Sequence, residues 1–173
     1  EEEGRKLSED ELVTTAILLL NAGHEATVHA IGNAAKAFLE LGLRDGIGEG
    51  HVEEALRYDA PLHLFTRYAL EDLDYAGLRL KKGEVVGLLL GAANRDPARF
   101  RDPDRFDPGR DPNPQVSFGA GIHFCIGAPL ARLEMQIALP LLFKRLPRLA
   151  LAETPRYRNA YHFHGLERLM VTY

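Results

Sequence analysis

The sequence predicts a mainly α-helical domain with small antiparallel β-sheets, an α+β architecture. Two helical patterns of different length support this class, one near each end of the chain. Between them, short apolar runs alternate with tight-turn signals over residues 62–90, which is typical of a small antiparallel sheet. A length of 173 residues with 46% apolar residues is enough for one packed domain.

The first helix is predicted over residues 8–41. Ser8 and Glu11 form the Ser-x-x-Glu capping box, and Gly42 supplies a stop signal. Small residues recur every four positions and form a smooth stripe on one face: Ala22, Ala26, Ala30 and Ala34. A helix of this length measures about 50 Å at 1.5 Å per residue. It should therefore project from a compact domain of this size or cross a larger protein.

Turn-forming and helix-breaking residues predict the remaining elements. The segment at 94–114 contains five prolines, each preceded by Asp or Asn, which predicts an ordered meander with little regular structure. The predicted elements after the first helix are a helix at 51–58, the β region at 62–90, this meander, a cysteine loop at 118–127, a helix at 126–146 and a terminal hairpin at 157–173.

Composition excludes several classes of protein. The formal net charge is −4, with 21 Lys and Arg against 25 Asp and Glu, so a general nucleic-acid binder is not expected. The single cysteine excludes an internal disulfide and a zinc site built from cysteines alone. No run approaches the ~20 apolar residues of a membrane span, and a cytoplasmic protein is expected. The chain begins with Glu1 rather than Met, so it is expected to be a piece of a longer protein.

The strongest chemical signal is a glycine-rich loop, Phe118-Gly-Ala-Gly-Ile-His-Phe-Cys-Ile-Gly127. It places Cys125 at the start of a helix, where free N–H groups and the helix dipole stabilise a thiolate. Apolar neighbours should exclude water from the sulfur. A buried thiolate that faces an open plane suits a haem iron, whereas the ordinary alternative is a lone core cysteine that packs as a small apolar residue.

This loop resembles the cysteine loop of the cytochrome P-450 family, and of its bacterial soluble members in particular. The family pattern Phe-Gly-x-Gly-x-His/Arg-x-Cys-x-Gly is matched at every fixed position. The resemblance covers the whole chain but only the C-terminal, haem-ligating portion of the family's fold. It implies haem b as cofactor, Cys125 as the ligand of the haem iron and His123 at a haem propionate, with three further cofactor-binding residues in the loop: Phe118, Gly119 and Gly127.

Three more segments match the family in the expected order. Glu54 and Arg57 correspond to its Glu-x-x-Arg helix, where residues three apart share a face and can pair. Arg105, in Pro103-Asp-Arg-Phe106, matches the meander arginine that completes a structural network with them. Arg67 matches a strand arginine that binds a haem propionate. Without the resemblance, the first pair and Arg67 would be read as exposed surface charges.

Residues 22–27 resemble the family's oxygen-side helix motif, Ala-Gly-x-Glu/Asp-Thr-Thr. The resemblance implies that Ala22 and Gly23 line the haem and that Glu25 belongs to the proton-delivery pair. The usual threonine falls at position 26, which is alanine here. Thr27 is one residue further, about 100° around the helix. Water, a substrate hydroxyl or Thr27 after a local distortion would then have to replace the missing hydroxyl.

Histidines offer an alternative chemistry. A zinc-protease helix needs His-Glu-x-x-His, but His29 follows His24 at i+5, about 140° around the helix. His162 and His164 are expected on one face of a strand, without a third ligand. Neither pattern predicts a metal site.

Two functional hypotheses follow. The first is a haem-thiolate monooxygenase, or its haem-ligating part, that activates O2 and hydroxylates a small apolar substrate. Its electrons would come from a ferredoxin-type or flavoprotein donor, and residues 125–170, with seven bases and three acids, could attract an acidic partner. The second is a truncated, non-catalytic fragment with haem absent or weakly bound, which forms a homodimer through exposed apolar surface.

Overall fold

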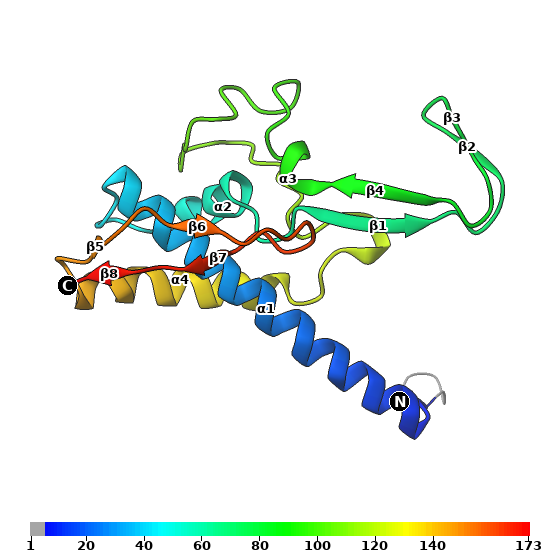
Figure 1. Cartoon of the computed structure of the whole chain (residues 1–173), viewed down its shortest axis with the longest axis horizontal. Helices are drawn as coiled ribbons and strands as arrows, with labels where there is room; N and C mark the ends of the chain where they lie inside the picture. Colours follow the sequence, from blue (N-terminus) through cyan, green and yellow to red (C-terminus); the bar gives the residue numbers. More distant parts are fainter. Residues whose placement is uncertain (1–5) are drawn as a thin grey trace.

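The computed structural model describes residues 6–173 (Figure 1). It confirms the predicted class, helices with small antiparallel sheets. Helices are α1 (Glu9–Leu41), α2 (Glu49–Tyr58), α3 (Leu90–Ala93), the 3-10 turn η1 (Gly121–His123) and α4 (Ala128–Arg145). Strands are β1 (Leu64–Tyr68), β2 (Leu73–Tyr75), β3 (Leu78–Leu80), β4 (Val85–Leu89), β5 (Ala150–Leu151), β6 (Arg156–Tyr157), β7 (Leu166–Arg168) and β8 (Val171–Thr172).

Helix α1 begins and ends where its capping signals lie. The Ser8 hydroxyl accepts a hydrogen bond from the Glu11 N–H at 3.3 Å, and the Glu11 carboxylate accepts one from the Ser8 N–H at 2.8 Å. The Ser8 N–H and the Ser8 hydroxyl both donate to the Glu11 carboxylate and lower its pKa. Gly42 closes the helix with a left-handed φ of +69°. The N-terminal half of α1 projects away from the rest of the molecule (Figure 1).

The core forms where the C-terminal half of α1 packs against α2 and α4. Phe38 is fully buried at its centre and packs edge-on against Phe106 of the meander, with ring centroids 5.8 Å apart. Alanines of the small-residue stripe let the helices approach closely, and Ala34 is 1% exposed. Helices α2 and α4 contribute large apolar side chains that are at most 2% exposed: Val52, Leu56, Met135 and Leu139.

The β region differs in detail from the expectation of one small sheet. It forms two separate two-stranded ladders, β1 with β4 and β2 with β3, which together make the long arm in Figure 1. The short helix α3 follows β4 directly and was not predicted. The C-terminal segment is two short pairings, β5 with β8 and β6 with β7, rather than the single hairpin expected over 157–173.

Two helix starts also differ. Helix α2 begins at Glu49 rather than 51, because Gly48 caps it and donates its N–H to Nδ1 of His51 at 3.3 Å. Helix α4 begins at Ala128 rather than 126, with Gly127 as its cap and Pro129 in its first turn. Among residues 6–173, no helix is both long and apolar enough to cross a bilayer.

Candidate haem-binding site and its supporting network

The cysteine loop is held in shape by its glycines and by backbone bonds. Gly119 and Gly121 adopt φ values of +71° and +68°, a region that other residues avoid. The Cys125 N–H donates to the Phe118 carbonyl at 3.0 Å, which closes the loop. The Cys125 carbonyl accepts from the Ala128 N–H at 3.2 Å, so the cysteine directly precedes α4. Local sequence thus fixes where the sulfur lies.

The sulfur is exposed, whereas the sequence predicted a buried thiolate. Cys125 is a free, solvent-exposed thiol among the described residues. The apolar residues around it are exposed as well: Ile122 is 97%, Phe124 49% and Ile126 87% exposed. Nothing in residues 6–173 covers this surface, and that is the physical reason for the difference. The loop therefore presents a thiol within an open apolar face.

This arrangement fits a haem that is bound to the protein through its iron. A thiolate is a soft donor that iron accepts, and an open apolar face can receive one side of a flat macrocycle. Gly127 lies beside the sulfur, where an added Cβ would make only an ordinary van der Waals contact with it at 3.8 Å. The loop thus has both the donor and the room for the group that its sequence implies.

The two predicted propionate ligands lie on different elements. Arg67 is in β1, where its guanidinium donates to the Thr66 carbonyl at 2.9 Å and lies 4.9 Å from the centre of the Phe65 ring. His123 ends η1 and is exposed. Within residues 6–173, no hydrogen bond or ion pair joins Arg67, His123 and Cys125. Their predicted roles toward a haem remain predictions.

The predicted residues of α1 face in two directions. Gly23 and Thr27 line a groove of about 480 Å³ between α1 and α4. Glu25 instead approaches the C-terminal strands, with its Oε1 3.4 Å from a guanidinium nitrogen of Arg158 and 3.5 Å from Nε2 of His29. Ala22 is exposed. The helix therefore does not bring Glu25 and Thr27 to the same face.

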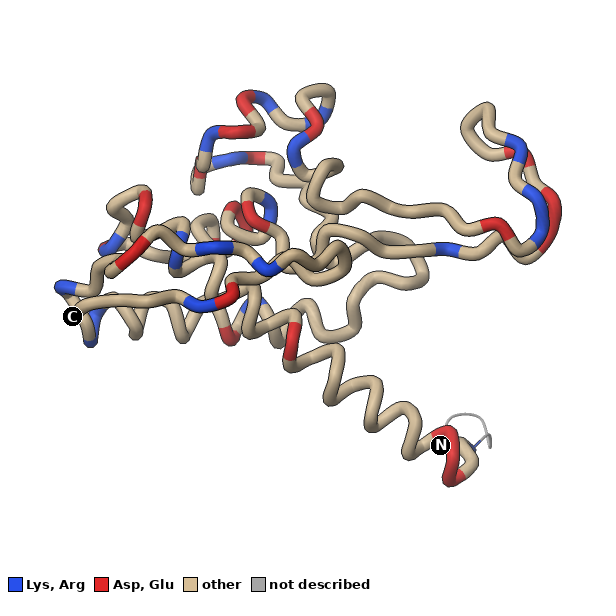
Figure 2. The backbone as a smooth tube through the Cα atoms, viewed as in Figure 1, with Lys and Arg blue, Asp and Glu red and all other residues tan. Residues whose placement is uncertain are grey.

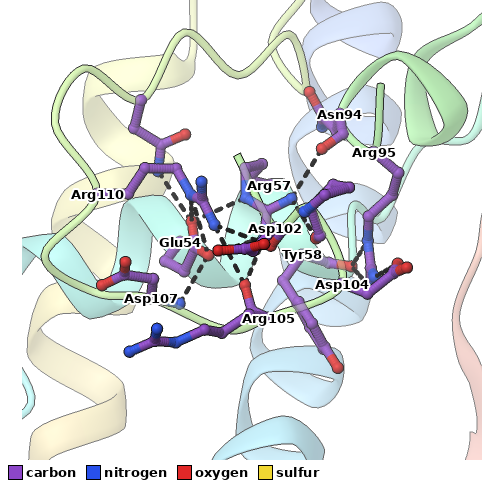
Figure 3. A network of polar contacts seen from close by, with 12 residues as sticks. Glu54, Arg57, Tyr58, Asn94, Arg95, Asp102, Asp104, Arg105, Asp107 and Arg110 are labelled. Atoms are coloured by element: carbon purple, nitrogen blue, oxygen red, sulfur yellow. Dashed lines mark hydrogen bonds and ion pairs between the residues drawn. The ribbon is translucent and has the colours of Figure 1, made fainter. Parts of the chain in front are cut away.

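A buried ion network fixes the meander to α2 (Figure 3). Glu54 and Arg57, 0% and 1% exposed, form a two-point ion pair with both N–O distances at 2.8 Å. Arg57 also donates to three backbone carbonyls between α3 and the middle of the meander: Asn94, Pro103 and Arg105, at 2.8, 2.9 and 3.1 Å. One buried arginine thus organises much of the meander.

The third charged member of this network is Arg110, not Arg105 as the sequence predicted. Arg110 Nε lies 3.3 Å from a carboxylate oxygen of Glu54, and its side chain is 9% exposed. Arg105 contributes only its carbonyl oxygen, and its side chain is exposed and directed away from Glu54 in Figure 3. The meander turns at this point so that the backbone of residue 105, rather than its side chain, faces the pair.

This difference gives a direct test. Replacing Arg110 with alanine removes charge-assisted hydrogen bonds from a buried carboxylate, so we expect a loss of about 2–3 kcal/mol in the free energy of unfolding. Replacing Arg105 with alanine leaves its carbonyl in place, and we expect a change within about 0.5 kcal/mol. Urea unfolding of both variants makes the measurement. Equal losses would contradict the observed assignment.

Two side chains that the sequence reasoning missed link this network to the cysteine loop. The Asn94 amide donates to Oγ of Ser117 at 2.8 Å, and Ser117 in turn donates to the Leu56 carbonyl at 2.7 Å. Ser117 directly precedes Phe118. The start of the loop is therefore tied to α2, and no short-range sequence pattern marks a contact between residues 94 and 117.

Arg132 was also missed. It lies on α4 and forms an ion pair with Glu53 of α2, at 2.5 and 3.0 Å, which raises its pKa. Its guanidinium carbon lies 4.6 Å from the centre of the Phe118 ring. The adjacent residues Glu53 and Glu54 thus hold two different parts of the site, one at α4 and one at the meander.

A second polar cluster lies apart from the cysteine loop and joins α2 to the C-terminal segment. Nε2 of His164 lies 3.1 Å from a carboxylate oxygen of Asp59, and the Tyr157 hydroxyl donates to the other oxygen. Burial and the Asp59 charge raise the pKa of Tyr157, which keeps its phenol protonated as a donor. His63 stacks on His164, and burial, together with His164, lowers its pKa.

Comparisons with known proteins agree with the geometry of the site. The cytochrome P450 family model matches residues 49–154. The chain is 49% identical to the biotin biosynthesis cytochrome P450 of Bacillus subtilis, over 97% of this chain and 45% of that protein. It is 44% identical to the vitamin D(3) 25-hydroxylase of Pseudonocardia autotrophica, over 99% of this chain and 45% of that protein.

Solved structures give the same result. The chain superposes on the cytochrome P450 PksS of Bacillus subtilis with a TM-score of 0.93 at 42% identity, over 99% of this chain and 47% of that one. It superposes on P450BioI, in its complex with an acyl carrier protein bearing hexadec-9Z-enoic acid, with a TM-score of 0.92 at 48% identity and the same coverage. The chain spans about half the length of the curated relatives it matches.

Proposed function

The chain belongs to the cytochrome P450 family, and on this premise we propose that it is the haem-ligating part of a monooxygenase, with Cys125 as the iron ligand. The observation that carries the proposal is the exposed Cys125 thiol in a glycine-shaped loop, within an open apolar face. A lone structural cysteine would not need left-handed glycines or an open surface. The reaction we propose is O2-dependent hydroxylation of a small apolar substrate by a cytoplasmic protein.

The residues that would hold haem b come from three elements. Cys125 would supply the thiolate that binds the iron, while Arg67 and His123 would supply hydrogen-bond donors for the two propionates. Phe118, Gly119 and Gly127 shape the loop beside the sulfur, and Ala22 and Gly23 offer a small-residue surface on α1. When bound, haem supplies the reduction and cleavage of O2, which thiolate ligation favours by donating electron density.

Residues of α1 would deliver protons to the reaction. Glu25 is half-buried and lies beside Arg158 and His29, so the carboxylate is kept in one place at the edge of α1. Ala26 leaves space where relatives of this family place a threonine hydroxyl. Thr27, the next residue and on the groove side of α1, offers a hydroxyl that could take over the transfer.

Electrons would come from a ferredoxin-type or flavoprotein donor. In the basic segment 125–170, three arginines are matched by acids in ion pairs: Arg132, Arg158 and Arg168. Among the described residues, four further cations of the segment form no ion pair: Lys144, Arg145, Arg148 and Arg156. Figure 2 shows basic positions at the end of α4 near the C-terminus, which would suit an acidic partner.

The substrate we propose is apolar because α1 and α4 expose many large apolar side chains. The relative P450BioI is bound in its structure to a carrier protein with a long acyl chain attached. An acyl chain of this kind would suit the leucine-rich and isoleucine-rich surface of α1 and α4, which includes Ile17, Leu20, Leu133 and Ile137.

A second candidate rests on the same surface. Because α1 exposes a row of large apolar residues, the chain alone could form a homodimer through this face and hold haem weakly or not at all. The exposed row on α1 comprises Leu12, Val13, Ile17, Leu18, Leu19 and Leu20. Such a fragment would be non-catalytic.

A visible spectrum separates the two candidates. The chain is mixed with ferric haem, reduced and exposed to CO; a thiolate-type Soret band is the expected result, and a pyridine haemochromogen assay identifies haem b. Sedimentation of the same sample gives the association state. A colourless dimer, with no haem taken up at stoichiometric concentration, would favour the fragment.

Restoring a hydroxyl at position 26 tests the proposed proton route in the complete, haem-loaded protein. If protons normally arrive through water or Thr27, Ala26→Thr should raise the fraction of electrons that end in product, since a second hydroxyl now serves the transfer. If the substrate supplies the hydroxyl, the new side chain crowds it and the fraction falls. Peroxide formed per electron consumed is the measurement. The change costs roughly half a kcal/mol in helix propensity, so folding is not expected to confuse the result. An unchanged ratio would show that position 26 does not govern proton delivery.

A further inference from the structure

The strongest feature that the proposed function does not use is the cluster of Asp59, His63 and His164. Each offers one donor atom, and the three donor atoms lie within 4.8 Å of one another. Among residues 6–173, no other group of three or more His, Cys, Asp or Glu residues meets that condition. The sequence pairs His164 with His162, but the structure instead places His164 beside two residues about a hundred positions away.

Backbone contacts hold the three residues together independently of their side chains. The His63 N–H donates to the His162 carbonyl at 3.1 Å, and the His164 N–H donates to the Pro61 carbonyl at 2.9 Å. Buried Asn33 of α1 donates to the carbonyls of both Asp59 and His164, at 3.2 and 2.9 Å. The cluster is therefore a fixed meeting point of three segments rather than a chance surface contact.

The charges around the cluster leave one carboxylate without a lysine or arginine. The cluster borders a cavity of about 390 Å³ that three cationic side chains also line. Each of these cations has its own acid: Lys36 pairs with Glu40, Arg57 with Glu54 and Arg95 with Asp104, at 2.7, 2.8 and 2.7 Å. The Asp59 side chain is 11% exposed, and within the described residues 6–173 its carboxylate forms polar contacts only with Tyr157 and His164.

We propose that Asp59, His63 and His164 form a binding site for a divalent transition-metal ion of the zinc class. Two imidazole nitrogens and one carboxylate oxygen are a donor set that zinc accepts, with water completing the coordination. The hydrogen bond from Tyr157 to one oxygen of Asp59 leaves the other oxygen, which now faces His164, for the ion. This is the outer-shell support that metal-bound carboxylates usually have.

Binding requires two small changes. The His63 and His164 rings stack with centroids 3.9 Å apart and planes 10° apart, so their nitrogen lone pairs lie in nearly parallel planes and do not converge on one point. One ring must turn about its Cβ–Cγ bond to share an ion, and that torsion has broad minima. The proton between His164 and Asp59 must leave, because metal ligands bind in their unprotonated form. The ion would then fasten the segment before β7 to the end of α2.

The test is a metal titration of the haem-free chain. Cys125 is replaced by serine in every sample, because its exposed thiol would also take up zinc. Zn2+ binding is followed by calorimetry and Co2+ binding by visible absorption. We expect one ion per chain and a higher melting temperature with the ion.

Matched variants locate the site. His63→Gln, His164→Gln and Asp59→Asn should each weaken binding at least tenfold, and Tyr157→Phe about tenfold through the lost outer-shell bond. His162→Gln is the control, since this exposed neighbour of the same segment lies outside the cluster, and it should leave affinity unchanged. Far-UV circular dichroism checks that each variant is folded. If a histidine-to-glutamine variant does not fold, Asp59→Asn still tests the site, because asparagine has nearly the same shape as aspartate. The proposal is overturned if the folded chain binds neither ion, or if binding survives all three ligand changes. The cluster would then only hold the segments together by hydrogen bonds.

Discussion

Replacing Glu54 with alanine is expected to lower the free energy of unfolding by about 3–5 kcal/mol, the cost of removing one partner from a buried ion pair. The carboxylate is 0% exposed and faces two cations, Arg57 and Arg110, of which the first is equally buried. It also accepts the Asp107 N–H at 2.8 Å and the Asn113 amide at 3.2 Å. Its removal leaves two guanidinium groups without a counter-charge and two donors without an acceptor. Native stability is commonly 5–15 kcal/mol, so such a loss is a large share of the total.

The matched control is Glu40→Ala. Glu40 pairs with Lys36 at 2.7 Å, but its side chain is 42% exposed and the pair lies on the surface of α1. Exposed pairs of this kind contribute about 0.3–0.5 kcal/mol. Urea unfolding at neutral pH compares the two variants. If Glu54→Ala were as mild as Glu40→Ala, the network would not carry the stability that its burial implies.

The same network explains why a stability change should reach the cysteine loop. Arg57 binds the Asn94 carbonyl, the Asn94 side chain binds Ser117, and Ser117 is adjacent to Phe118. Loss of Glu54 therefore frees not only the meander but also the start of the loop. Haem uptake by Glu54→Ala should fall more steeply than its remaining folded fraction accounts for.

Local signals account for the parts of the fold that the sequence predicted well. The capping box at Ser8 and the left-handed Gly42 set the bounds of α1 because both act within one turn of the helix. The Glu54–Arg57 pair follows from an i, i+3 spacing in the same way. The cysteine loop is recognisable because its glycines are required by backbone shape at fixed positions.

What the sequence did not predict depends on how distant segments meet. The spacing of the meander arginines does not reveal that the chain turns between Arg105 and Arg110 and offers a carbonyl from one and a guanidinium from the other. The approach of His164 to Asp59 spans a hundred residues and leaves no periodic pattern. The exposure of Cys125 is different again, because burial of its neighbours would need chain or ligand beyond residues 6–173.

Replacing Cys125 with serine is expected to abolish the thiolate-type spectrum of the reduced, CO-bound protein completely. A serine hydroxyl does not ionise at neutral pH and is a hard oxygen donor, so it cannot replace the soft thiolate on iron. The fold should survive, because the Cys125 side chain is exposed and the loop is closed by its backbone N–H, which serine keeps. The control is His123→Gln, which should keep the thiolate band while it weakens retention of haem.

A second measurement does not depend on the spectrum: a thiol-alkylating reagent should modify Cys125 rapidly in the haem-free chain and slowly once haem is bound. An unchanged band in the serine variant, or equal alkylation with and without haem, would show that Cys125 is not the ligand, since the open apolar face would then receive haem without its sulfur.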